Sequence, residues 1–145
     1  KSSFNALRKG GRFVFQMGGD GNMRLLLKAA ETVSSKPEWS RFMEGFQFPW
    51  HFPTLDECRG NIEEAGFEVH RLESFPRQVR GKSLEELVGW MRPLWMAWTE
   101  MLPDHESKER LLLETAQEHL KLSSSCDDAP YCISMVRIAA ELSKR

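Results

Sequence analysis

Hydrophobic residues recur with two different periods along the chain, and each change of period marks a predicted element. Residues 4–7 are mostly apolar and run into a basic pair and two glycines, which is typical of a helix C-terminus. The next stretch alternates, with Phe13, Phe15 and Met17 on one face, and predicts a strand over 12–17. We therefore expect a helix, a glycine turn and a strand, in that order.

A glycine-rich loop and an amphipathic helix follow this strand. Asn22 is placed to cap the helix, and apolar residues from Met23 to Val33 follow the 3.6-residue period. Residues 39–53 are rich in aromatic residues and proline and fit neither period. This stretch predicts a packed loop.

A second helix-to-strand unit starts at Thr54. This threonine is suited to cap a helix that ends at Gly66, and a strand is predicted at 67–69. The repeated order of helix and strand predicts an α/β fold.

The second half of the chain is mainly helical. An apolar stripe runs from Leu84 to Trp98, but Pro93 removes a backbone donor and predicts a kink or break within 89–92. We interpret residues 81–125 as a helical insertion. Within it the pattern predicts a helix at 112–122. A polar loop at 123–130 and, at 131–140, a strand covered on both faces are predicted to follow this helix.

Composition and charge narrow the class of protein. The 145 residues are 41% hydrophobic and 28% charged, which suits one globular domain over residues 1–145. The 20 basic and 21 acidic residues are interspersed and give a net charge of -1, so binding to nucleic acid or to an anionic membrane is disfavoured. Without a membrane-length apolar run or a leader pattern, we expect a soluble, cytoplasmic protein.

The cysteines and histidines predict no metal centre. Cys58, Cys126 and Cys132 are an odd number at wide spacing, which gives neither a disulfide framework nor paired zinc ligands. The 4 histidines share no ligand-like spacing. We expect a protein without a metal site.

Several segments, in order, resemble the second half of the class I S-adenosylmethionine-dependent methyltransferases. Residues 7–15, LRKGGRFVF, resemble the family's "L-x-P-G-G-x-hydrophobic" turn into strand five. Residues 52–59, FPTLDECR, and 64–69, EAGFEV, resemble the "F-P-S-x-x-E-Y-R" and "E-A-G-F-x-V" run into strand six. Residues 131–140 are similar to the closing strand seven.

The branch that fits best contains trans-aconitate methyltransferase and malonyl-carrier-protein methyltransferase. Two positions depart from its pattern, since Lys9 stands where proline is common and Cys58 where tyrosine is common. The resemblance implies the C-terminal part of a Rossmann-like α/β sheet, strands five to seven, with an inserted helical lid. It also implies methyl transfer from S-adenosylmethionine to a small-molecule acceptor, a carboxylate or a hydroxyl.

The cofactor's own signature does not occur in this sequence. The family's glycine-rich loop after strand one and acidic residue after strand two find no counterpart. No cofactor-binding residue is therefore assigned. We expect a fragment that lacks the cofactor-binding half and is inactive by itself.

The candidate acceptor site lies at the carboxyl end of the first predicted strand. Ligands of open α/β sheets bind beyond the carboxyl ends of the strands, so we expect Met17, Gly18 and Asn22 to border the site. The loop between them has three interpretations: a tight structural turn, a substrate-facing loop, or a phosphate cradle that lacks the usual glycine spacing.

Two residue pairs complete the candidate site. Trp50 and His51 lie in the aromatic loop, where a ring can wall an apolar pocket and a histidine can act as a general base. Trp90 and Arg92 lie in the predicted lid, where Arg92 is suited to bind a carboxylate. The simpler alternatives are core packing for the tryptophans and a solvated surface charge for the arginine.

A second hypothesis is a non-catalytic binding module. A sheet that begins with strand five leaves one edge of residues 12–17 unpaired, and such an edge invites self-association. The sequence alone leaves the choice open between an enzyme for a small-molecule substrate and a homo-oligomeric interaction module.

Overall fold

The computed structural model describes residues 2–123 and 131–145, which form two compact units. The sheet unit comprises the residues up to 22 together with 51–77 and 135–145. The helical unit comprises residues 23–50 and the described part of 78–134. The helical unit thus takes in the predicted insertion and also the first amphipathic helix.

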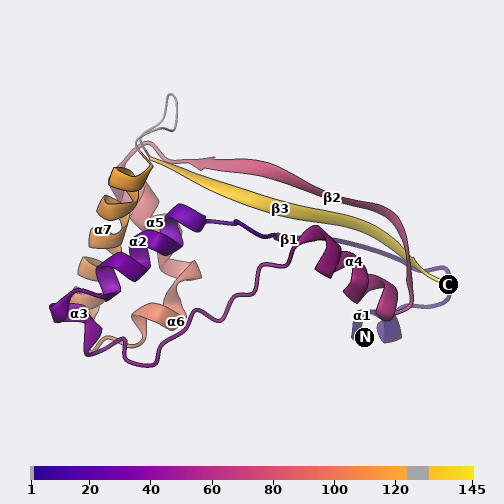
Figure 1. Ribbon diagram of the computed structural model, residues 1–145, viewed down its shortest axis with the longest axis horizontal. Helices are drawn as coiled ribbons and strands as arrows, with labels where there is room; N and C mark the ends of the chain where they lie inside the picture. Colours follow the sequence, from indigo (N-terminus) through magenta and orange to yellow (C-terminus); the bar gives the residue numbers. More distant parts are fainter. Residues whose placement is uncertain (1, 124–130) are drawn as a thin grey trace. The chain divides into compact units, whose positions relative to one another are not determined.

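The sheet has three strands in the order β1-β3-β2 (Figure 1). They are β1 (Arg12–Gly18), β2 (Phe67–Arg80) and β3 (Cys132–Lys144). β1 runs antiparallel to β3, with Phe15 opposite Ala140. This arrangement confirms a mixed α/β fold, and the strands expected as five, six and seven lie in the order five, seven, six. β2 is far longer than the three-residue strand that the sequence predicted, because pairing along β3 extends it.

One face of the sheet is covered by α1 (Ser2–Ala6) and α4 (Leu55–Glu64). The Phe13 and Phe67 rings stack at 5.7 Å between centroids. The buried side chains of this core are Cys58, Ile62, Phe67, Ile138, Ala140 and Leu142. In β3 buried and half-buried residues alternate from Ile138 onward, so the expectation of a strand covered on both faces is wrong there.

The opposite face of the sheet explains this alternation. It carries charged side chains. The Glu141 carboxylate lies 3.4 Å from the Arg12 guanidinium and 3.9 Å from the Arg71 guanidinium. Charged groups keep their hydration where a helix does not cover them, so this face stays partly open to solvent.

The sequence signals at the two ends of α4 are confirmed. The Thr54 hydroxyl accepts a hydrogen bond from the Glu57 amide at 3.2 Å, and the Glu57 carboxylate accepts from the Thr54 amide at 2.8 Å. This reciprocal capping box satisfies two backbone donors that the helix itself leaves unpaired. At the other end Gly66 has φ +93°, a conformation that glycine adopts without strain.

The helical unit is built on the packing of α2 (Arg24–Ser34) against α7 (His105–Leu122). Around this pair lie α3 (Pro37–Ser40), α5 (Leu84–Leu94) and α6 (Met96–Thr99). α7 begins earlier than its apolar stripe predicted, because the Asp104 carboxylate caps it by accepting from the Ser107 amide at 2.8 Å.

Two local expectations in this unit are wrong. Asn22 does not cap α2, since the helix is preceded by Met23 at φ 54° with no side-chain cap. The break expected as one alternative within 89–92 does not occur, since α5 runs through Pro93 to Leu94 and α6 starts after Trp95. The Trp95 amide still donates to the Met91 carbonyl at 3.0 Å, so one turn continues beyond the proline.

The polar loop predicted at 123–130 lies outside the described residues except for Ser123. None of the helices in the described ranges is long and apolar enough to span a membrane.

Candidate functional site

The loop after β1 is closely packed. A Cβ atom on Gly18 would lie 2.7 Å from the side-chain nitrogen Nδ2 of Asn22 and 2.7 Å from the Phe52 ring. On Gly19 it would lie 2.8 Å from the Ile138 side chain. Both positions therefore require glycine because protein atoms already occupy the space that a side chain would need.

Backbone hydrogen bonds hold this loop to its own unit. The Gly19 amide donates to the Val136 carbonyl at 3.0 Å, and the Asp20 amide donates to the Pro53 carbonyl at 2.9 Å. The Asn22 side chain, only 3% exposed, accepts from the Val136 amide at 3.2 Å. These contacts are those of a tight structural turn, and the amides of a phosphate cradle would have to be free instead.

Three of the candidate residues therefore lie together at the end of β1. Met17 packs against the core of the sheet unit, while Gly18 and Asn22 are engaged in the turn. Their contact with an acceptor stays a prediction. Asn22 has a structural role that its position in the sequence did not indicate, since its partner is 114 residues away.

His51 is the most open of the candidate residues. Its side chain is 78% exposed, and its Nε2 lies 4.0 Å from the Glu57 carboxylate. The hydrogen bond from the Thr54 amide holds the pKa of Glu57 below its usual value, with a smaller contribution from the nearby imidazole. His51 thus stands beside a carboxylate that is already committed to the helix cap.

Trp50 belongs to an aromatic cluster inside the helical unit. It stacks on Phe48 at 5.2 Å between centroids and meets Trp95 edge-on at 5.8 Å. Trp95 and Trp98 are 0% and 1% exposed. The Trp98 indole donates to the Ser34 hydroxyl at 3.2 Å, whereas the Trp95 indole nitrogen has no hydrogen-bond partner among the described residues. Core packing, the simpler interpretation, accounts for Trp95 and Trp98.

Trp90 and Arg92 lie apart from this cluster. Trp90 is half-buried on α5 and makes no ring contact with another described aromatic residue. Arg92 donates to both carboxylate oxygens of Glu109, from Nε at 2.8 Å and from Nη2 at 2.6 Å. These hydrogen bonds raise the pKa of Arg92 and lower that of Glu109. The guanidinium is therefore in bidentate contact with a carboxylate, but with one from α7.

A cavity of about 550 Å³ opens beside the aromatic cluster, wholly within the helical unit. Its lining residues come from α2, from α3 and from the aromatic loop, with one ring from α6. They are Leu27, Glu31, Ser34, Ser35, Ser40, Met43, Phe46, Gln47, Phe48 and Trp98.

Most of this cavity was not predicted from the sequence. The aromatic loop was a candidate, but Trp50 and His51 were the predicted residues rather than Phe46 and Phe48. A usable signal was the polar side of α2, where Glu31, Ser34 and Ser35 recur at the helical spacing opposite the buried stripe.

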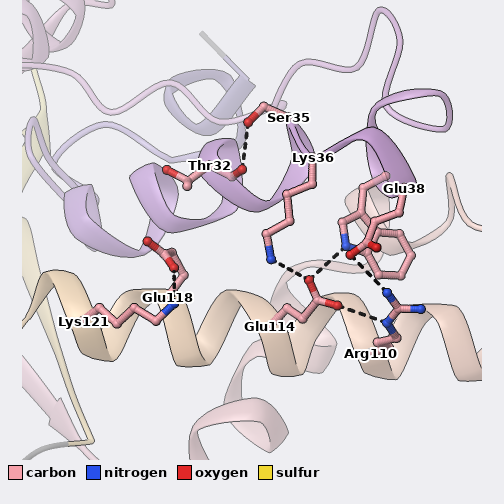
Figure 2. A network of polar contacts seen from close by, with 9 residues as sticks. Thr32, Ser35, Lys36, Glu38, Arg110, Glu114, Glu118 and Lys121 are labelled. Carbon is pink, nitrogen blue, oxygen red and sulfur yellow. Dashed lines mark hydrogen bonds and ion pairs between the residues drawn. The ribbon is translucent and has the colours of Figure 1, made fainter.

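A polar network around Glu114 on α7 holds Lys36 and Trp39, which lie between the cavity residues Ser35 and Ser40 in the sequence (Figure 2). The Glu114 carboxylate accepts from Lys36 at 2.8 Å, from the Trp39 indole at 3.1 Å and from Arg110 at 3.0 Å. Burial by itself raises the pKa of Glu114, but these three hydrogen bonds outweigh it and leave the pKa lowered. Through Lys36 and Trp39 the network ties the start of α3 to α7, next to the serines of the cavity wall.

The described residues contain no group of three His, Cys, Asp or Glu side chains placed to hold a metal ion.

Sequence comparison does not place the chain in a family. No family model matches it, and no curated protein matches it significantly. Comparison of structures does find similar folds. A loganic acid methyltransferase solved with SAH superposes over 93% of this chain with a TM-score of 0.63 and 15% sequence identity. The chain has part of a methyltransferase fold.

The chain spans less than two thirds of the solved methyltransferases. It covers 42% of the loganic acid methyltransferase. A putative methyltransferase from Bacillus halodurans C-125 aligns over 99% of this chain and 60% of its own, at a TM-score of 0.48 and 15% identity.

Proposed function

We propose that this chain is the C-terminal, acceptor-binding part of an S-adenosylmethionine-dependent methyltransferase that acts on a small molecule with a carboxylate or hydroxyl group. The observation that carries the proposal is the structural likeness to the loganic acid methyltransferase over 93% of the chain. The ordered resemblance of the glycine turn and of the segment before β2 to class I methyltransferases supports it, and the trans-aconitate branch is the relationship we propose.

The cofactor would be held outside the residues described here. The only glycine-rich loop that follows a described strand is the turn after β1, where Asn22 and Phe52 crowd Gly18 and Ile138 crowds Gly19. A nucleotide needs open glycine faces and free backbone amides, so this loop does not fit it. We therefore assign no cofactor contact to this chain.

What this chain would supply is the acceptor's surroundings. Methyl transfer is accelerated largely by alignment of the reactants and by exclusion of water, and neither requires a covalent intermediate on the protein. The apolar side chains beside Arg92, namely Leu84, Val88 and Leu113, line a separate cavity of the helical unit that is suited to this task. The helical unit is the lid in this proposal.

Arg92 is the residue that we propose for an acceptor carboxylate. Its bidentate contact with Glu109 supports this role, because the guanidinium already holds a carboxylate in the geometry that an acceptor would need. An acceptor would have to displace Glu109. Loss of Arg92 should therefore weaken acceptor binding, whereas loss of the Glu109 charge should strengthen it. Breaking a plain surface ion pair would change acceptor binding in neither variant.

A pair of variants in the full-length enzyme tests this proposal. Arg92→Ala should raise the KM for a carboxylic acid acceptor by at least about tenfold, because charge-assisted hydrogen bonds are worth about 1.5–3 kcal/mol. Glu109→Gln should lower the same KM because it frees the guanidinium. Cofactor affinity should be unchanged in both. If both variants change only thermal stability, Arg92 is a surface residue and the proposed role is wrong.

The second candidate function is a self-associating module. β1 lies at an edge of the described sheet, and Val14 on its outer face is 66% exposed. This observation favours pairing of β1 with another chain.

A further inference from the structure

The cavity beside the aromatic cluster carries negative charge and no positive charge in its lining. Glu31 is its only charged lining residue, and no lysine, arginine or histidine lines it. The Glu31 backbone carbonyl accepts from the Ser35 amide at 3.1 Å, but the Glu31 carboxylate makes no hydrogen bond or ion pair with a described residue. The cavity therefore presents a carboxylate that the described residues leave unpaired.

Two serine hydroxyl groups near Glu31 are further hydrogen-bond acceptors. The Ser35 hydroxyl donates to the Thr32 carbonyl at 2.8 Å, so its oxygen retains lone pairs for a ligand (Figure 2). The Ser34 oxygen accepts from the Trp98 indole at 3.2 Å and has a second lone pair. A ligand with N–H donors could donate hydrogen bonds to these oxygens, whereas a carboxylate ligand would be repelled by the like charge of Glu31.

The remaining wall is apolar and largely aromatic. Phe46 and Phe48 meet edge-to-face at 5.2 Å, and Trp98 lies 5.9 Å from Phe48. Leu27 and Met43 extend this wall. Such rings pack against flat apolar molecules, and their faces also attract cations.

We propose that this cavity binds a flat apolar molecule that carries a protonated amine, with its rings against Phe46 and Phe48 and its ammonium group at Glu31. A volume of about 550 Å³ lies within the range of small-molecule sites, about 300–1,000 Å³. The site goes beyond the proposed function, which concerns a carboxylate or hydroxyl that receives a methyl group. Binding of the amine needs no cofactor and no methyl transfer.

The structure also accounts for a preformed site. The serine-bearing wall is continuous with Lys36 and Trp39, which Glu114 holds against α7 (Figure 2). A wall that is fixed before the ligand arrives reduces the entropy that binding must overcome.

The test compares three probes that share one ring system and differ in charge. We would titrate 2-naphthylmethylamine, 2-naphthylmethanol and 2-naphthoate into the 145-residue chain at low salt and follow binding by calorimetry and by the indole NMR signal of Trp98. The amine should bind at least tenfold more tightly than the naphthoate, with the alcohol between them.

Charge-matched variants locate the effect. Glu31→Gln should weaken the amine about fivefold, as expected for a solvent-accessible ion pair of up to about 1 kcal/mol, and should leave the alcohol unchanged. Glu44→Gln removes the same charge from an exposed residue of the same unit that does not line the cavity, and should change neither probe.

Three outcomes would overturn the proposal: no saturable binding of the amine, equal affinity for the amine and the naphthoate, or a Glu31→Gln variant that binds the amine like the parent chain. Because no cofactor is present in this experiment, its failure leaves the proposed methyl transfer untouched. Conversely, a methyltransferase that acts on a carboxylic acid would not rescue the amine site.

Discussion

Single residues decide how closely the chain packs where β1 ends. Gly18→Ala would place a Cβ atom 2.7 Å from both Asn22 and Phe52, and we expect a loss of about 1–3 kcal/mol of unfolding free energy. Gly60→Ala is the matched control in the same unit, because it is an exposed position in α4 with no atom within 4 Å of the new Cβ. It should stabilise the chain by about 0.5–1 kcal/mol through helix propensity. Urea unfolding measures both, and equal effects would contradict the packing described.

At this scale the sequence predicted what depends on neighbours in the chain. The capping box of Thr54 and Glu57 lies within one turn, so its motif was sufficient. Asn22 was misassigned as a helix cap because its real partner, Val136, comes from β3. For the same reason the pairing of Arg92 with Glu109 could not be seen, since it depends on how α5 packs on α7.

At the scale of elements, Glu114 connects the start of α3 to α7. Glu114→Ala should lower the unfolding free energy by about 1–3 kcal/mol, because it leaves the buried Trp39 indole without its acceptor. Glu118→Ala is the control: its side chain is equally exposed, at 19%, but its partner Lys121 lies on the same helix. Such a pair is worth about 0.5 kcal/mol or less. Equal losses in the two variants would mean that the network does not anchor α3.

The same network makes stability depend on pH. The folded state lowers the pKa of Glu114 below 4.5, so its contribution is complete above that value and is lost as the pH falls through the lowered pKa. Glu114→Gln should therefore flatten the acid side of the stability curve. An unchanged acid limb, measured by urea unfolding across pH, would contradict this assignment.

Elements with a regular period were the ones that the sequence predicted well. α2, α4 and β1 appear where their apolar positions indicated. The length of β2 and the start of α7 were not predicted, because pairing with β3 and the Asp104 cap set them rather than hydrophobic period. The cavity was missed because it needs three segments to meet, and periodicity describes each segment separately.

At the scale of the whole molecule, the free edge of β1 predicts self-association. We expect dimers or larger species by light scattering, and Val14→Lys should shift them toward monomer because a lysine on an edge strand blocks pairing. Leu113→Lys adds the same charge to an exposed position on α7 and should have no effect. A parent chain that is monomeric at high concentration would contradict this prediction.

The central claim is that this chain carries the acceptor side of a methyltransferase and no cradle for the cofactor. Calorimetry of the 145-residue chain with S-adenosylmethionine tests it most directly. The tightly packed turn after β1 leaves no space beside Gly18 and Gly19, so we predict no saturable heat up to about millimolar cofactor, which corresponds to binding weaker than about 4 kcal/mol. A dissociation constant in the micromolar range would contradict the account.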